Sequence, residues 1–80
     1  MPKCTFEDLL KMLEEEDIIL DVDFASLDHD VTLKEQGIDS VDLVSILFGV
    51  ENYFNIKIGK DAVATQWNTI NKIIDNINNM

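Results

Sequence analysis

The sequence predicts an all-α fold, a small antiparallel bundle of three main helices plus a short helical turn, with a long first loop. Two observations lead to this class. Apolar residues recur at helical spacing in residues 5–16, 40–54 and 69–78. Strand-like alternation is confined to residues 55–60, where Gly59 interrupts a stretch too short to stand without partners, so a loop is expected there.

The first predicted helix covers residues 5–16. Thr5 and Asp8 have the spacing of a capping box. The apolar face that follows consists of Phe6, Leu9, Leu10 and Leu13. The acidic run from Glu14 to Asp17 places negative charge where the helix dipole prefers cations, so the helix should stop near Asp17.

Residues 18–39 lose the helical periodicity and are predicted to form a long loop. Aspartate, serine and threonine side chains in it favour local turns. Because long loops in small domains are usually anchored, its apolar residues are expected to reach the core: Ile18, Leu20, Phe24, Leu27 and Leu33. Thr32 is placed to cap a single turn through Gln36, which Gly37 would end.

The second helix is predicted over residues 40–54. Its apolar face is expected to consist of Val41, Val44, Leu47, Phe48, Val50 and Phe54. A polar stripe is expected to consist of Asp42, Ser45, Gly49 and Asn52. Glycine inside a helix costs about 0.5–1 kcal/mol relative to alanine, so Gly49 indicates close packing or an approach surface, with a tolerated glycine as the alternative.

The last part of the chain predicts one short turn and one helix. Residues 61–64 have the length of a single helical turn. Thr69 precedes an amphipathic run over residues 69–78, whose apolar positions are Ile70, Ile73, Ile74 and Ile77. The 80 residues suffice for one modest core, so we expect a single domain over residues 1–80. The sequence has no sustained heptad repeat of the kind that would indicate an obligate coiled coil.

The chain carries a formal net charge of −10. Such a charge disfavours nucleic acid and anionic membrane surfaces and favours basic patches on other proteins. Cys4 is the only cysteine, which excludes an internal disulfide and fits a reducing cytoplasm. No apolar run approaches the roughly 20 residues that a bilayer-spanning helix needs.

Ser40 stands where the irregular loop turns into the second helix, so its hydroxyl is expected at a helix N-terminus. Serine at such a place is commonly a capping residue, and this structural role is the alternative to a chemical one. The surrounding sequence, Gly-Ile-Asp-Ser-Val-Asp at residues 37–42, resembles the Gly-x-Asp-Ser-Leu-Asp motif of acyl carrier proteins. The similarity continues at family spacing through Val44, Glu51, Phe54 and Ile58 and extends over nearly the whole chain.

This resemblance implies that the chain is an acyl carrier protein without catalytic residues of its own. A phosphopantetheinyl transferase would move 4′-phosphopantetheine from coenzyme A to Ser40, and the arm would carry acyl groups as thioesters between enzymes of fatty acid or related biosynthesis. The resemblance also implies that enzymes with basic docking patches recognise the second helix, at Asp39, Val41, Asp42, Phe48 and Glu51. The alternative for Val41 and Phe48 is ordinary core or boundary packing.

Two departures from the motif leave the cargo open. Ser45 stands where fatty-acid carriers usually have an acidic residue, and Val41 replaces the common leucine. Residues 67–74, Trp-Asn-Thr-Ile-Asn-Lys-Ile-Ile, locally resemble D-alanyl carrier proteins. A D-alanyl, aminoacyl or polyketide carrier is therefore the alternative cargo class, although Trp67 and Thr69 also suit a purely structural start to the last helix.

Other functions have weaker support in the sequence. A serine hydrolase would need His29, the only histidine, beside Ser40, and the glycine-rich elbow of such enzymes is absent. The aspartates in residues 21–30 lack the glycine and distal glutamate of a helix-loop-helix calcium site, so no metal site is predicted. An unmodified acidic docking module is a further alternative. A carried chain would be sheltered by Ile46, Val50, Ile58 and Trp67.

Overall fold

The computed structural model describes residues 4–79. Four α-helices follow one another along the chain, α1 (Phe6–Glu15), α2 (Ser40–Phe54), α3 (Val63–Gln66) and α4 (Ile70–Asn78). Short 3₁₀ turns lie between them, η1 (Phe24–Ser26), η2 (Lys34–Gln36) and η3 (Lys60–Ala62). No strand forms within residues 4–79. The predicted all-α, acyl-carrier-like class is confirmed, and the predicted turn at residues 61–64 corresponds to η3 and the start of α3.

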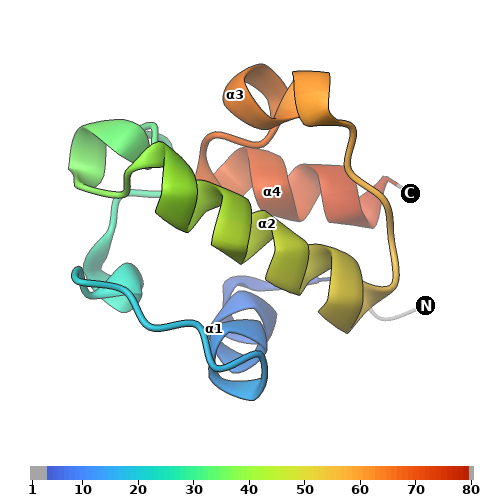
Figure 1. Cartoon of the computed structure of the whole chain (residues 1–80), viewed down its shortest axis with the longest axis horizontal. Coiled ribbons are helices and arrows are strands. Elements are labelled where there is room, and N and C mark those ends of the chain that lie inside the picture. Colours follow the sequence, from blue (N-terminus) through green and yellow to red (C-terminus); the bar gives the residue numbers. More distant parts are fainter. Residues whose placement is uncertain (1–3, 80) are drawn as a thin grey trace.

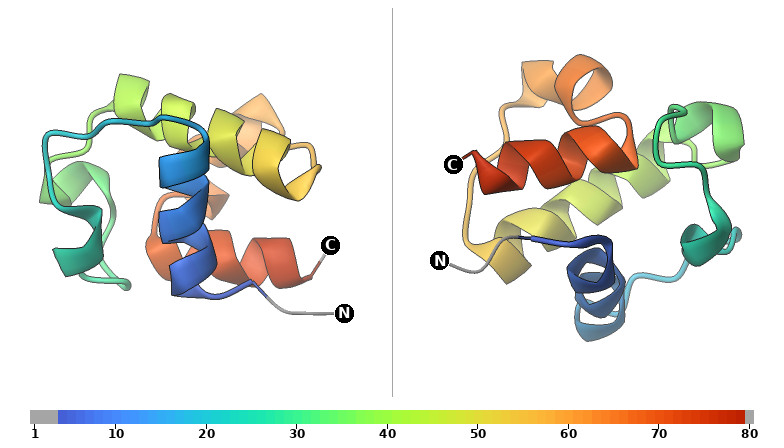
Figure 2. Two further views of the ribbon diagram at one scale, coloured as in Figure 1. Left: turned by 90° about the horizontal axis from the view of Figure 1, so that it is seen from below. Right: turned by 180° about the vertical axis from the view of Figure 1, so that it is seen from behind.

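Helices α2 and α4 lie side by side and run in the same direction, because α3 carries the chain back between them (Figure 1). Helix α1 crosses this pair and is seen nearly end-on in Figure 1 and along its length in the left view of Figure 2. Helix α1 packs against α2, and α3 packs against α4. None of the described helices is long and apolar enough to cross a bilayer.

One hydrophobic core joins the helices and the long first loop. Its most deeply buried side chains are Leu9, Met12, Leu33, Ile38, Ile46, Val50, Ile70 and Ile73. The loop residues Phe24 and Leu33 are buried, and Ile18, Leu20 and Leu27 pack against the core, as predicted. The loop is therefore held by apolar anchors despite its lack of regular structure.

The caps at the helix ends agree with the sequence in two cases out of three. Thr5 and Asp8 form the predicted capping box of α1. Thr69 caps α4 by accepting a hydrogen bond from the Lys72 amide at 3.0 Å. The predicted cap at Thr32 is wrong, since η2 begins after Leu33 without a side-chain cap bond. Gly37 does end this turn, with φ of 100° in the left-handed region that favours glycine.

The predicted apolar face of α2 needs correction. The buried residues of this helix are Leu43, Ile46, Leu47, Gly49 and Val50. Val41, Val44 and Phe48 are exposed instead, at 72%, 43% and 62%. Because α2 is apolar on two adjacent rows of its surface, its periodicity does not identify the row that faces the core. Core packing is thereby excluded as the role of Val41 and Phe48.

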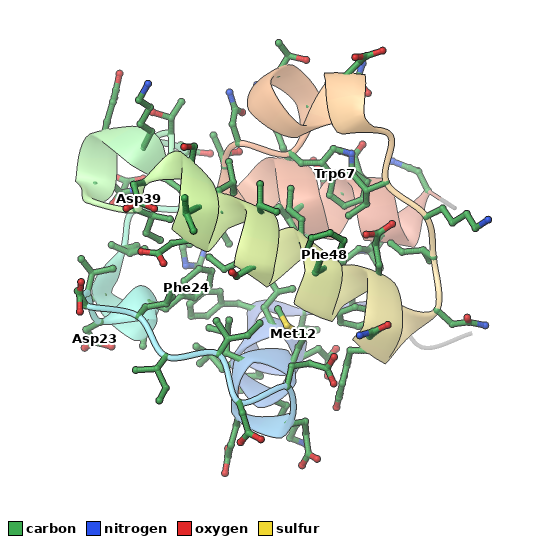
Figure 3. The ribbon with its side chains drawn as sticks, viewed as in Figure 1. Met12, Asp23, Phe24, Asp39, Phe48 and Trp67 are labelled. Atoms are coloured by element: carbon green, nitrogen blue, oxygen red, sulfur yellow. The ribbon has the colours of Figure 1, made fainter. Side chains whose placement is uncertain are left out.

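Gly49 belongs to the packed face of α2, and its assignment to a polar stripe is wrong. A β-carbon at this position would lie 2.6 Å from Ile18 Cδ1 and 2.7 Å from Met12 Sδ. Figure 3 shows Met12 between α1 and α2. Among close packing, an approach surface and a tolerated glycine, close packing is therefore the correct explanation of Gly49.

Because the Cys4 thiol is buried, we expect the folded chain to lose stability at alkaline pH. Burial, with a smaller contribution from the charge of Asp8, raises the pKa of Cys4 from 9.0 to about 11. The folded chain thus holds this proton more tightly than the unfolded chain. The stabilisation is fully present below pH 9 and is lost as the pH rises through about 11.

Urea unfolding between pH 8 and pH 11 measures this effect, with Cys4→Ala as the control. We expect the free energy of unfolding to fall more steeply with pH in the parent chain than in the variant. Equal slopes in the two chains would contradict the prediction.

Candidate functional site

Three consecutive residues set the position of Ser40. Gly37 turns the chain out of η2 in the left-handed conformation. Ile38 then enters the core, where 1% of its surface is exposed, and its amide donates to the Leu33 carbonyl at 3.0 Å. Asp39 follows in an extended conformation as the N-cap of α2. A buried anchor thus stands two residues before an exposed serine at the first position of the helix.

The segment before Ser40 is braced from the loop side by the Gln36 amide. Its Oε1 accepts from the Asp28 amide at 2.6 Å, and its Nε2 donates to the carbonyls of Asp28 and Val31 at 2.8 and 3.0 Å. The Leu33 amide in turn donates to the Asn68 carbonyl at 2.9 Å, just before α4. These bonds connect the start of α2 to the rest of the fold.

Asp39, and not Ser40, is the residue that caps α2. The Asp39 carboxylate accepts from the Asp42 amide at 2.8 Å, and its carbonyl accepts from the Leu43 amide at 2.9 Å. Ser40 is exposed, and its hydroxyl makes no hydrogen bond to any of the residues 4–79. The capping alternative for Ser40 is therefore wrong, and its oxygen is accessible to chemistry.

The N-terminus of α2 offers a suitable setting for a phosphate ester. A helix of 15 residues directs the positive end of its dipole at this point. Asp39 occupies the Asp42 amide, whereas the amides of the first two helical residues have no acceptor inside the helix. The dipole contributes only about 0.3–1 kcal/mol, which is small against the neighbouring carboxylates of Asp39 and Asp42. A covalent phosphate ester is compatible with this field, whereas reversible phosphate binding is weak.

An exposed apolar strip runs along α2 from this end. It consists of Val41, Val44 and Phe48, which we call the α2 strip, and their spacing of three and four residues places them on one side of the helix. In Figure 3 Asp39 lies at the first turn of α2 and Phe48 lies near its middle. The strip therefore begins beside Ser40 and follows the helix axis.

Glu51 lies on the same helix but is engaged within the chain. Its Oε2 accepts from the Ile58 amide at 2.9 Å, and the side chain is half-buried. The predicted sheltering residues lie nearby in sequence or in the core: Ile46, Val50 and Trp67 are buried, and Ile58 packs against the same core.

The alternative sites predicted from single residues find no support. The His29 ring packs on Phe6 with a centroid distance of 4.3 Å, and no hydrogen bond joins it to Ser40 in the described part of the chain. The carboxylates of Asp23 and Asp28 accept from amides two residues on, at 3.1 and 2.9 Å. Asp30 accepts from the Asn71 side chain. No group of three or more potential metal ligands occurs among residues 4–79.

A comparison with protein families decides the assignment. The model of the family described as "Phosphopantetheine attachment site" matches residues 4–77. The chain belongs to this phosphopantetheine attachment site family. The match is consistent with the acyl carrier resemblance of residues 37–42. A search of the curated proteins found no match.

The family's cofactor is 4′-phosphopantetheine, attached covalently, and the start of α2 suits it. Such an attachment needs an accessible hydroxyl, and the exposed Ser40 at the start of α2 offers one. As members of this family are carriers, the chain is a phosphopantetheine carrier protein. Carrier domains in general interact with phosphopantetheinyl transferases and with the enzymes that handle their cargo.

Proposed function

We propose that the chain is an acyl carrier protein with 4′-phosphopantetheine attached through Ser40 Oγ, in fatty acid or related biosynthesis. The observation that supports the proposal is that two neighbouring residues at the start of α2 have different roles. Asp39 caps the helix, which leaves the Ser40 hydroxyl exposed and unbonded within the described chain. When bound, the group supplies a thiol that holds the cargo as a thioester. The chain itself contributes a fixed attachment point and no catalytic residue.

Loading of the chain would transfer 4′-phosphopantetheine from coenzyme A to Ser40 Oγ. The Ser40 oxygen bonds to the phosphorus on the pantetheine side of the coenzyme A pyrophosphate. The pyrophosphate P–O bond breaks, adenosine 3′,5′-bisphosphate leaves, and the serine proton passes to a base of the transferase. The first amides of α2 have no acceptor inside the helix and would favour the negative charge of a phosphate ester on Ser40.

The proposed recognition surface surrounds this serine on α2. It consists of the exposed residues Val41 and Phe48 with the carboxylates of Asp39 and Asp42. An apolar strip beside acidic groups suits an enzyme surface that has a hydrophobic patch with a basic rim. For Glu51 the bond to the Ile58 amide favours a role inside the chain over the predicted partner contact.

The setting of the proposed carrier follows from its charge and its cysteine. A net charge of −10 favours basic enzyme partners over nucleic acid or anionic membranes. The free Cys4 thiol fits a reducing cytoplasm. We propose one carrier domain over residues 1–80, acting as a monomer.

Intact-protein mass spectrometry tests the attachment. The unmodified chain is incubated with coenzyme A and a broad-specificity phosphopantetheinyl transferase, and any added mass is mapped by fragmentation. We expect a gain of one phosphopantetheine on Ser40. A folded chain that gains no mass would overturn the proposal in favour of the unmodified docking module.

A further inference from the structure

Glu51 accepts hydrogen bonds from backbone amides of residues 55–58, the segment that follows α2. Its backbone carbonyl accepts from the amides of Asn55 and Ile56, the latter at 3.1 Å. Its carboxylate Oε2 reaches further and accepts from the Ile58 amide at 2.9 Å. One residue in the last turn of α2 thus binds three of the four amides in residues 55–58. The segment is thereby folded back towards the helix it has just left.

Little else holds these residues by hydrogen bonds. Asn55 turns the chain with φ of 55°, in the left-handed region that asparagine tolerates. In the described part of the chain, the reported amide bonds of residues 55–58 all end on Glu51. Beyond these bonds, the side chains of Ile56 and Ile58 pack against the core. The Glu51 carboxylate is therefore the polar contact that fixes the far end of the segment.

The same segment forms one wall of a cavity. The cavity has a volume of about 300 Å³ and is open to solvent. Its lining includes residues 57–59, the end of α3 with Trp67, and Asn76 of α4. Figure 3 shows Trp67 beside α4, under the chain that leads into α3. Ile58 and Trp67 both line this cavity. A displacement of Ile58 would therefore be expected to change the exposure of Trp67.

We propose that Glu51 is a positioning residue: its carboxylate holds residues 55–58 against the core and closes the cavity wall over Trp67. This role requires a side chain long enough to place an acceptor oxygen at the Ile58 amide, and the negative charge is less important. A role in docking would instead require the negative charge, because a basic partner attracts a carboxylate even when the side chain is one methylene shorter. The inference goes beyond the proposed carrier function and does not depend on it.

Two conservative variants separate the two requirements. Glu51→Gln keeps an acceptor oxygen at the same reach and removes the charge. Glu51→Asp keeps the charge and shortens the side chain by one methylene, which withdraws the carboxylate from the Ile58 amide. Glu35→Asp is the matched control, because Glu35 is exposed and its carboxylate has no reported hydrogen bond in the described chain.

Amide hydrogen exchange of Ile58 is the first readout. We expect about ten- to hundredfold faster exchange in Glu51→Asp and about fivefold or less in Glu51→Gln, since a hydrogen bond to a charged acceptor is only moderately stronger than one to a neutral acceptor. The Leu43 amide, bonded to Asp39 at the other end of α2, should exchange at the parent rate in both variants. Glu35→Asp should leave the Ile58 amide unchanged.

Fluorescence of Trp67, the single tryptophan, is the second readout. Only 3% of its surface is exposed in the closed arrangement. Acrylamide quenching should increase in Glu51→Asp and stay near the parent value in Glu51→Gln. The proposal is overturned if Glu51→Asp behaves like the parent in both readouts, or if Glu51→Gln loses as much protection as Glu51→Asp. Mass gain at Ser40 is expected in every variant, so failure of the carrier proposal would be seen separately.

Discussion

The variant Ser40→Ala is expected to gain no mass from coenzyme A and a phosphopantetheinyl transferase, and to fold as stably as the parent chain. The loss is complete because the hydroxyl oxygen is the proposed nucleophile of the transfer. The change in the free energy of unfolding should stay within about 0.5 kcal/mol, as for other exposed positions without special contacts. Intact mass and urea unfolding of the same sample give both quantities.

Asp39→Ala is the matched control for this prediction. It removes the cap that accepts from the Asp42 amide and should cost about 0.5–2 kcal/mol. Because Ser40 keeps its hydroxyl but the proposed recognition surface loses one carboxylate, the mass gain should be slower in Asp39→Ala and still reach one phosphopantetheine. A mass gain in Ser40→Ala would place the attachment on another hydroxyl. A stability loss in Ser40→Ala as large as that in Asp39→Ala would return the capping role to the serine.

Much of the fold could be predicted from the sequence because its local signals agree with one another. The capping box at Thr5, the cap at Thr69 and the apolar spacing in residues 69–78 each specify a helix without reference to the rest of the chain. The loop anchors Phe24 and Leu33 followed from the need to hold a long segment. Such signals depend on neighbours within a few residues, which a sequence displays directly.

The start of α2 shows the limit of such signals. Asp39 and Ser40 are both good N-cap residues, and a shift of one position exchanges their roles. In the structure Ile38 is buried directly before Asp39, and Asp39 caps the helix. Burial at Ile38 depends on the assembled core. The sequence therefore predicts a site at the start of α2 but does not identify Asp39 as the residue that caps the helix.

Contacts made across the fold were the least predictable. Gln36 bridges Asp28 and Val31, and Glu51 binds the Ile58 amide seven residues on. Each contact depends on how a loop returns to an element, and neither residue type nor spacing indicates it. The buried row of α2 was missed for a similar reason. With apolar residues on two rows, only the position of Met12 and Ile18 beside Gly49 shows which row is packed.

The apolar side chains of the α2 strip are exposed to water, which is unfavourable unless a binding partner covers them. Phe48 leaves 62% and Val41 leaves 72% of its surface in water on a chain whose other large apolar residues are mostly buried. Exposed apolar residues clustered on one face are characteristic of interaction surfaces. The strip starts at the residue next to Ser40, so an enzyme that acts on the group proposed to be attached there would approach the strip.

Phe48→Ala should therefore lower kcat/KM of a phosphopantetheinyl transferase for this carrier by about tenfold or more, as for an aromatic anchor at the centre of an interface. Its free energy of unfolding should change by less than about 0.5 kcal/mol, because the ring is mostly exposed. Initial rates at saturating coenzyme A, measured over a range of carrier concentrations, give kcat/KM. Urea unfolding gives the stability.

Ile19→Ala is the control that separates docking from a general loss of apolar surface. Ile19 is 92% exposed but lies in the loop after α1, outside the α2 strip. Its replacement should leave kcat/KM at the parent value, since it removes an exposed apolar side chain away from Ser40. Equal effects of the two variants, or no effect of Phe48→Ala, would mean that the transferase does not contact the strip. A reduction confined to Phe48→Ala would make this ring part of the surface by which the transferase reaches Ser40.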